Sequence, residues 1–138
     1  MKAVNYSEGK VKVINAPKPS GDGILVNISS CGICGTDMDM LNNKGHFSHI
    51  AGHEMSGRLT DGTLVAIEPL DYCGGCSECK SGNYNLCSNE KFQMIGLTSN
   101  GGMAEQIIVP ENCLVKLDQE INPKTSCPVS YTHITNST

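Results

Sequence analysis

Residues 73–87 read Cys73-Gly-Gly-Cys76-Ser-Glu-Cys79-Lys-Ser-Gly-Asn-Tyr-Asn-Leu-Cys87, with three cysteines at three-residue steps and a fourth eight residues later. The surrounding stretch 71–90 is polar, so burial of apolar side chains cannot offset the entropy of ordering its backbone. Four thiolates at this spacing can surround one tetrahedral ion, and zinc favours such a closed, all-sulfur sphere. The spacing therefore predicts a zinc site that holds this loop together, with Cys73, Cys76, Cys79 and Cys87 as ligands.

Two other uses of these cysteines are weaker. Bacterial ferredoxins also begin with cysteines at three-residue steps, but their fourth cysteine follows after three residues and precedes a proline. Here seven residues separate Cys79 from Cys87, and Ser88 follows. Disulfides are formally open to eight cysteines. However, residues 1–10 lack the apolar run of a secretory signal, which indicates a reducing, cytoplasmic location where thiols serve metals more often than disulfides.

Outward from the loop, the chain reads as mainly β and as a single domain. Its 138 residues are 38% hydrophobic, and 15 glycines and 6 prolines interrupt it repeatedly. Alternating apolar and polar residues predict half-buried strands at 11–14 and 24–28, and short apolar runs predict strands at 64–67 and 107–109. We expect one or two short helices.

The helical candidate is 36–42, directly after Cys34. Thr36 or Asp37 could cap this helix, and Met38 and Leu41 would then face the core. Elsewhere, no run approaches the roughly 18 apolar residues of a membrane span. The formal net charge is -4, with scattered basic residues. Nucleic acid and acidic membranes are therefore excluded as expected partners, in favour of a small molecule or another protein.

A second cysteine and histidine constellation flanks this helix. Cys31-Gly-Ile-Cys34-Gly-Thr36-Asp37 is followed, nineteen residues after Cys34, by Gly52-His53-Glu54. A thiolate and an imidazole from separated segments are usual ligands of a catalytic zinc, which keeps one position open. Each residue alone is weak support, because a lone cysteine is usually a small buried hydrophobe.

Three other interpretations of this constellation fit less well. An HExxH protease helix would need a second histidine where Gly57 stands. A Cys31–Cys34 redox pair lacks the surrounding βαβ pattern. A zinc ribbon built from these two cysteines with Cys73 and Cys76 would need an unusually long gap and would leave Cys79 and Cys87 without a role.

Together these motifs resemble the N-terminal catalytic domain of zinc-dependent medium-chain alcohol and polyol dehydrogenases, over residues 1–124. Val65-Ala-Ile-Glu-Pro69 and Gly101-Gly-Met-Ala-Glu105 also match, in the family's order. The resemblance implies a GroES-like β-barrel with a structural zinc lobe. It also implies oxidation of a secondary alcohol to a ketone with NAD(P) by the full-length form, which is a candidate homo-oligomer.

The same resemblance assigns roles to individual residues. Cys34 and His53 would bind the catalytic zinc, and Glu54 would be an inner-sphere or neighbouring carboxylate. Thr36 would hydrogen-bond the substrate hydroxyl and pass its proton outward. Asp37 would hold His53 in the ligating tautomer, as metal-bound histidines generally require. Many members carry a histidine near the start of the short helix, whereas this chain has Met38 and Asp39 there.

The sequence lacks the G-x-G-x-x-G of a Rossmann cofactor domain, since Gly21-Asp-Gly23 is followed by Val26. We therefore expect NAD(P) to bind only with a domain absent from this chain, and the chain to be inactive alone. Residues 125–138 are an atypical, disordered tail by composition, although Cys127 is a conceivable replacement ligand. A non-enzymatic zinc-binding interaction module is the alternative function.

The remaining cysteine and histidines receive modest interpretations. Cys113 lies in a strand-like segment and is expected to pack in the core. His46 and His49 would line the loop that leads to His53, and His133 receives no role.

Overall fold

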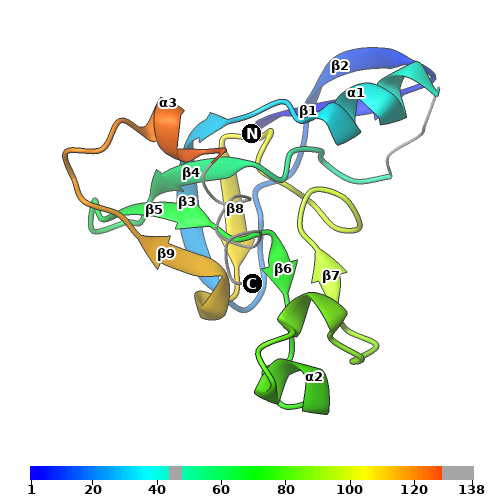
Figure 1. Cartoon of the computed structure of the whole chain (residues 1–138). Coiled ribbons are helices and arrows are strands. Elements are labelled where there is room, and N and C mark those ends of the chain that lie inside the picture. The colour runs from blue at the N-terminus through cyan, green and yellow to red at the C-terminus, as the bar shows by residue number, and fades with distance from the viewer. Residues whose placement is uncertain (44–47, 129–138) are drawn as a thin grey trace.

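The computed structural model describes residues 1–43 and 48–128, so His46, His133 and most of the predicted tail lie outside the described residues. Its centre is an antiparallel sheet in the order β8-β3-β4-β5-β9, which curls into a half-barrel (Figure 1). The strands of this sheet are β3 (Ile24–Cys31), β4 (Met55–Arg58), β5 (Leu64–Ile67), β8 (Gln106–Val109) and β9 (Leu114–Lys116). The mainly β, GroES-like fold predicted from the sequence is confirmed, including its strands at 24–28, 64–67 and 107–109.

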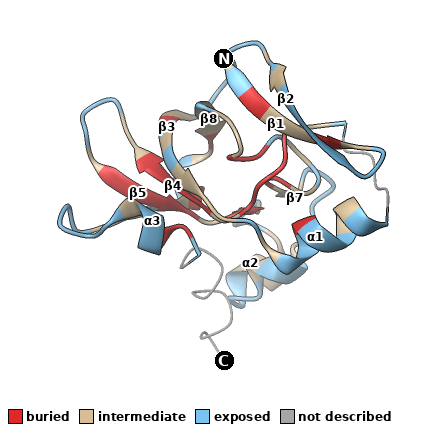
Figure 2. Cartoon of the chain, turned by 90° about the horizontal axis from the view of Figure 1, so that it is seen from above, coloured by how far each residue is buried: buried red, intermediate tan, exposed pale blue. Residues whose placement is uncertain are grey.

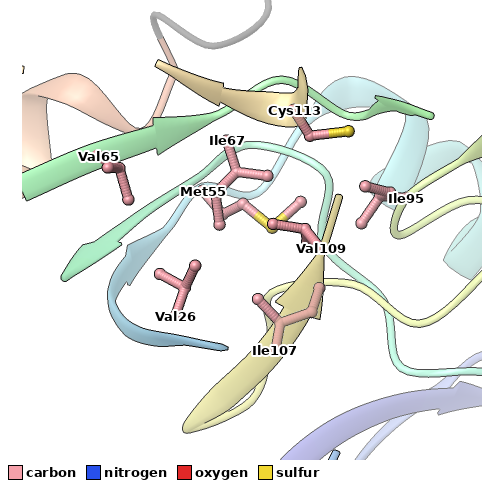
Figure 3. Close-up of a cluster of buried hydrophobic side chains, with 8 residues drawn as sticks. All are labelled: Val26, Met55, Val65, Ile67, Ile95, Ile107, Val109 and Cys113. Carbon is pink, nitrogen blue, oxygen red and sulfur yellow. The ribbon is translucent and has the colours of Figure 1, made fainter. Parts of the chain in front are cut away.

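The concave side of the sheet holds the hydrophobic core (Figure 3). Val65 and Ile67 of β5 are fully buried, as is Met55 of β4. The cluster of buried side chains comprises Val26, Met55, Val65, Ile67, Ile95, Ile107, Val109 and Cys113. All four residues of β5 are buried, which explains its continuous apolar run, and Figure 2 shows the buried residues concentrated along β4 and β5. Cys113 packs here as predicted.

A hairpin of β1 (Lys2–Ser7) and β2 (Lys10–Asn15) stands apart from the main sheet and forms its own two-stranded sheet. The strand predicted at 11–14 is confirmed, but its expected burial is wrong. Val11 is 56% exposed and Val13 is 70% exposed. β2 pairs with β1 alone among the described strands, and these exposed fractions show that no described residues cover the face that carries Val11 and Val13.

The helix predicted at 36–42 is confirmed as α1 (Gly35–Asn42), with a different cap and a different buried face. Cys34 is the N-cap, and the Asp37 carboxylate accepts a hydrogen bond from the Cys34 backbone N–H at 2.8 Å, as in a capping box. Met38 is 47% exposed, and Asp37 is buried instead. The inward side of α1 therefore carries Asp37, with Met40 and Leu41 half-buried beside it.

The four-cysteine loop forms a separate lobe at one end of the molecule (Figure 1). A two-stranded sheet of β6 (Leu70–Asp71) and β7 (Gln93–Met94) forms its base, and its body contains α2 (Ser77–Lys80) and the 3-10 turn η1 (Tyr84–Leu86). Tyr72 and Tyr84 stack with ring centroids 4.8 Å apart. No residue from 71 to 90 is buried, so the lobe beyond its base has no hydrophobic core of its own.

Two further short elements complete the described chain: the 3-10 turn η2 (Glu111–Cys113) and the helix α3 (Pro123–Ser126). Helix α3 crosses the domain boundary predicted at residue 124, and Ser56 of β4 donates a hydrogen bond to the Pro123 carbonyl at 2.8 Å. Cys127 is only 5% exposed. No helix in the described part of the chain has the length and apolar character needed to cross a membrane.

Three glycines from separate segments, Gly52, Gly96 and Gly101, pack against one another next to His53. A Cβ on Gly96 would lie 2.1 Å from the Gly52 carbonyl oxygen, and one on Gly101 would lie 2.2 Å from the same atom. Gly52 itself has φ +97°, a conformation that L side chains rarely adopt. This junction brings the His53 segment against two loops with no space for a side chain.

Candidate metal sites

The four sulfurs of the lobe have the spacing of a tetrahedral metal site. Their Sγ–Sγ distances are 3.6 Å for Cys73–Cys87, 4.0 Å for Cys73–Cys79 and 4.0 Å for Cys76–Cys87. Zinc–sulfur bonds of about 2.3 Å in a tetrahedron place sulfurs about 3.8 Å apart. No disulfide joins any of the eight cysteines, all of which lie in the described part of the chain. The loop therefore fits zinc without rearrangement.

Backbone N–H groups of the lobe point at its sulfurs. Those of Gly75 and Cys79 donate to Cys73 and Cys76 at 3.4 and 3.5 Å. The N–H of Cys79, followed by that of Ser88, lowers the pKa of the Cys76 thiol to about 5. In contrast, desolvation followed by the neighbouring thiols of Cys76 and Cys87 raises the pKa of Cys79 to about 12. Four crowded thiols cannot all ionise without a cation among them, and a bound metal supplies that charge.

The second candidate site lies where α1 meets the segment before β4. Ligand atoms of Cys34, His53 and Glu54 all lie within 4.8 Å of one another. Cys34 follows β3, and His53 and Glu54 precede β4, so all three lie at the end of the β3–β4 pairing that follows its irregularity between Ile28 and Ser30. Bulges of this kind are common beside functional sites, where they redirect side chains. The structure thus brings Cys34 next to the adjacent pair His53 and Glu54, which follow it by about twenty positions in the sequence.

Glu54 reaches this site because Gly32 has no side chain. A Cβ on Gly32 would lie 2.5 Å from the Glu54 Oε2 atom and 3.2 Å from its Cβ. The Gly32 backbone N–H also donates to the Glu54 carbonyl at 2.7 Å. The only sign of this role in the sequence is the position of Gly32 between Cys31 and Cys34.

Asp37 and Thr36 occupy different environments next to Cys34. Asp37 is 1% exposed. Its Oδ1 atom is buried and receives no hydrogen bond from the described residues, so a nearby cation would compensate its charge. Thr36 is exposed, and its hydroxyl lies 3.9 Å from the Cys34 Sγ. The predicted roles of Asp37 toward His53 and of Thr36 toward substrate remain predictions.

The remaining thiols lie outside this group of three. The Cys127 Sγ accepts a hydrogen bond from Ser30 at 3.6 Å and does not belong to the cluster. The Cys31 Sγ lies against Gly52, where a Cβ would be only 2.6 Å from it. Burial, followed by the charge of Asp37, raises the pKa of the Cys31 thiol to about 12. Neither thiol is therefore placed as a ligand.

A cavity of about 620 Å³ lies away from both clusters, between the segment after β2 and the base of the lobe. His49 lines it, and burial lowers the pKa of this imidazole. Two amide side chains of the lining hold the His49–Ile50 backbone: Asn5 donates to the His49 carbonyl, and Asn100 accepts from the Ile50 N–H. Neither group of potential metal ligands found among the described residues lines this cavity, so we assign the metal chemistry to the cysteine and histidine clusters.

Comparisons with known proteins identify the family. Residues 20–119 match the family described as the alcohol dehydrogenase GroES-like domain. The chain is 37% identical over 107 residues to L-galactonate-5-dehydrogenase of Escherichia coli K12, covering 68% of this chain and 31% of that protein. It is 36% identical over 121 residues to galactitol 1-phosphate 5-dehydrogenase of the same organism, covering 77% of this chain and 34% of the relative. The chain thus spans about a third of each relative.

Solved structures agree with this assignment. The crystal structure of E. coli galactitol-1-phosphate dehydrogenase is 31% identical, with a TM-score of 0.81 over 92% of this chain and 41% of that one. Acetophenone reductase from Geotrichum candidum, solved with NAD, has a TM-score of 0.84 at 21% identity over 94% of this chain and 43% of that one, which supports the fold alone. The resemblance predicted from the motifs is confirmed: the chain belongs to the alcohol dehydrogenase family and comprises its GroES-like domain.

Proposed function

We propose that this domain provides the zinc site and the proton-transfer residue of a dehydrogenase that oxidises a secondary alcohol of a polyol to a ketone with NAD(P). The observation that carries the proposal is the convergence of Cys34, His53 and Glu54 within 4.8 Å. The names of the two E. coli relatives support a polyol or a sugar acid as the substrate class. When bound, zinc at this site supplies a Lewis acid that polarises the alcohol oxygen.

The residues around the site have separate roles in metal binding, orientation of His53 and proton transfer. Cys34 and His53 are metal ligands, and Glu54 supplies a carboxylate oxygen within the same cluster. Asp37, which is buried, holds His53 in the ligating tautomer. Thr36, exposed beside Cys34, hydrogen-bonds the substrate hydroxyl and passes its proton toward solvent. Met38 and Asp39 follow it on α1, so the outward path uses water rather than a histidine.

The four-cysteine lobe has a structural role in this proposal. Its four sulfurs complete a tetrahedral sphere with no open position for substrate. The ion bound there supplies the stability that the lobe, lacking a core, cannot obtain from burial. We therefore assign chemistry to only one of the two ions.

We further propose that the 138-residue chain does not turn over by itself. The sequence contains no G-x-G-x-x-G segment, and the strands of the described sheets pair antiparallel, unlike the parallel strands of a dinucleotide-binding domain. Reduction of NAD(P) by the purified chain with a panel of polyols would contradict this. A non-enzymatic zinc module gains no support, since the matched relatives are named as dehydrogenases.

Cobalt binding to the purified chain tests the active-site assignment. We expect two equivalents of Co²⁺ per chain, both with thiolate-to-metal absorption, because each site contains cysteine. Cys34→Ser should remove the absorption of the second equivalent alone. Cys127→Ser is the matched control, since that thiol lies outside the cluster, and it should leave both equivalents unchanged. Binding of a single equivalent by the unsubstituted chain would exclude the site.

A further inference from the structure

Backbone hydrogen bonds connect strand β1 to the segment before His53 through residues 102–103. The Val4 N–H donates to the Met103 carbonyl at 2.7 Å, and the Met103 N–H donates to the Ala51 carbonyl at 2.9 Å. Beside this bond, the Gly102 N–H donates to the Gly52 carbonyl at 2.8 Å. Residues 102–103 therefore fix the backbone immediately before His53, and β1 fixes residues 102–103 in turn.

The side chain of Tyr6 fills the space inside this arrangement. It is 4% exposed and packs with Ala51, Met40 and Met103. Ala51 lies two residues before His53, and Met40 lies three residues after Asp37 on α1. Tyr6 therefore contacts both segments that carry the metal site, although it comes from a strand outside the main sheet.

The Tyr6 hydroxyl forms a specific bond in this position. It donates to the Met103 Sδ atom at 3.2 Å, and a thioether sulfur is a weak acceptor. Burial, followed by the charges of Asp37 and Cys31, raises the pKa of Tyr6 to about 12. The hydroxyl therefore remains a protonated donor even at alkaline pH.

Met103 transmits this contact to the residue before His53. A Cβ on Gly52 would lie 2.6 Å from the Met103 Cγ atom and 2.6 Å from the Cys31 Sγ atom. The methionine side chain therefore lies directly against the Gly52 backbone. A continuous series of contacts runs from the Tyr6 hydroxyl through Met103 to Gly52 and the His53 backbone.

We propose that Tyr6 is a positioning residue of the Cys34–His53–Glu54 site: its hydroxyl fixes Met103, which holds the Gly52–His53 backbone in the metal-binding arrangement. The inference rests on the proposed function, because it assumes that this cluster binds the second ion. Tyr6 touches neither metal nor substrate, and it acts only through the geometry of His53.

A double-mutant cycle on the purified chain tests the proposal, with Co²⁺ as the probe and the lobe filled first with one equivalent of Zn²⁺. Tyr6→Phe removes the hydroxyl, and Met103→Leu removes the sulfur with little change in volume. Each should weaken binding of Co²⁺ at the second site by about three- to tenfold, the scale of one net hydrogen bond, and shift its visible absorption bands. The double variant should bind Co²⁺ at the second site as tightly as the single variant with the lower affinity, because both substitutions break the same bond.

The outcomes separate the inference from the function beneath it. If the unsubstituted chain binds no second ion, the proposed site is wrong and the inference falls with it. If it binds a second ion and Tyr6→Phe leaves its affinity and spectrum unchanged, only the inference is overturned. Additive single effects also overturn it, since the bond would then carry no coupling. Tyr84→Phe, in the lobe, is the matched control and should leave the second site unchanged.

Discussion

The lobe and the Cys34–His53–Glu54 cluster offer similar ligands but obtain their geometry in opposite ways. All four lobe cysteines lie within residues 73–87, and short turns such as α2 aim their sulfurs at one point. The second cluster draws Cys34 from the start of α1 and the other two ligands from the segment before β4. Local spacing builds the first site, whereas the packing of the whole domain builds the second.

This difference predicts separate failures. Damage to the lobe should leave the sheet and the second site intact, whereas damage to the sheet or to its contacts should weaken the second site and spare the lobe. The following experiments test that separation, beginning with the largest expected effect.

Removing one lobe ligand should unfold the lobe alone. Structural zinc contributes about 10–16 kcal/mol in small zinc modules, and the lobe has no core to replace that stability. We expect Cys76→Ser to lower zinc content by one equivalent and to increase proteolysis within residues 73–90 by at least about tenfold. Hydrogen exchange of β4 and β5 should not change.

Ser77→Ala is the control for this experiment, because Ser77 is exposed in the same lobe. Loss of protection in β5 upon Cys76→Ser would show that the two regions unfold together.

A cavity in the sheet should produce the reverse pattern. Met55 is fully buried and directly follows Glu54, so Met55→Ala should lower the free energy of unfolding by about 2–5 kcal/mol. It should also weaken metal binding at the second site and leave the ion in the lobe bound. Urea denaturation with metal analysis measures both. Met38→Ala, at a side chain that is 47% exposed, should change stability by less than about 0.5 kcal/mol.

A methyl group on Gly32 should affect the second site without a comparable loss of stability. Its Cβ would displace the Glu54 Oε2 atom, the end of a flexible side chain, and would lie 3.2 Å from the Glu54 Cβ, which needs only a shift of a few tenths of an ångström. We expect Gly32→Ala to weaken Co²⁺ at the second site by about tenfold, as loss of a supporting group typically does.

Gly35→Ala provides the matched comparison, because a Cβ there meets nothing within 4 Å. Equal affinities for the two glycine variants would show that Glu54 does not contribute to binding.

The smallest expected effect is a loss of stability at alkaline pH that is caused by Cys113 in the sheet region. Burial, followed by the charges of Asp71 and Glu68, raises the pKa of Cys113 from 9.0 to about 12, opposite to the lowered pKa of Cys76. A raised pKa means that Cys113 contributes its stability below about pH 9 and loses it as the pH rises toward 12. At pH 10 the loss is about 1 kcal/mol.

Chemical denaturation between pH 8 and 10 measures this loss. Cys113→Ala should reduce the alkaline decline in stability but not abolish it, because the pKa values of Tyr6 and Cys31 are raised as well. An unchanged decline would show that Cys113 is not the titrating group.

Short-range patterns predicted the parts of the fold that depend on neighbours in sequence. The run Leu64–Ile67 indicated a buried strand, and the cysteine spacing indicated the lobe. Strand β4 was missed because Met55-Ser-Gly-Arg58 has neither alternation nor an apolar run. Its centre is nevertheless buried: a Cβ on Gly57 would lie 2.4 Å from the Asn27 carbonyl oxygen. That burial reflects contact with β3, which no local pattern records.

Long-range contacts account for the rest. Alternation correctly gave a strand around Val11 and Val13, but it could not show that no layer covers their face. Cys34 and His53 were paired through resemblance to a family, not through spacing. Tyr6 and Met103 are 97 positions apart, and neither residue type suggests a metal site. Only their contacts in the folded chain do.

The junction of Gly52, Gly96 and Gly101 has a consequence for how this sequence can vary. Substitutions at Gly96 and Gly101 would collide with the Gly52 carbonyl oxygen, an atom that cannot rotate away as a side chain does. In a saturation mutagenesis screen these two positions should tolerate almost no other residue, although neither belongs to the two clusters of metal ligands. Their profile would look like that of an active-site residue, and only assays that report folding separately from metal binding would distinguish the two.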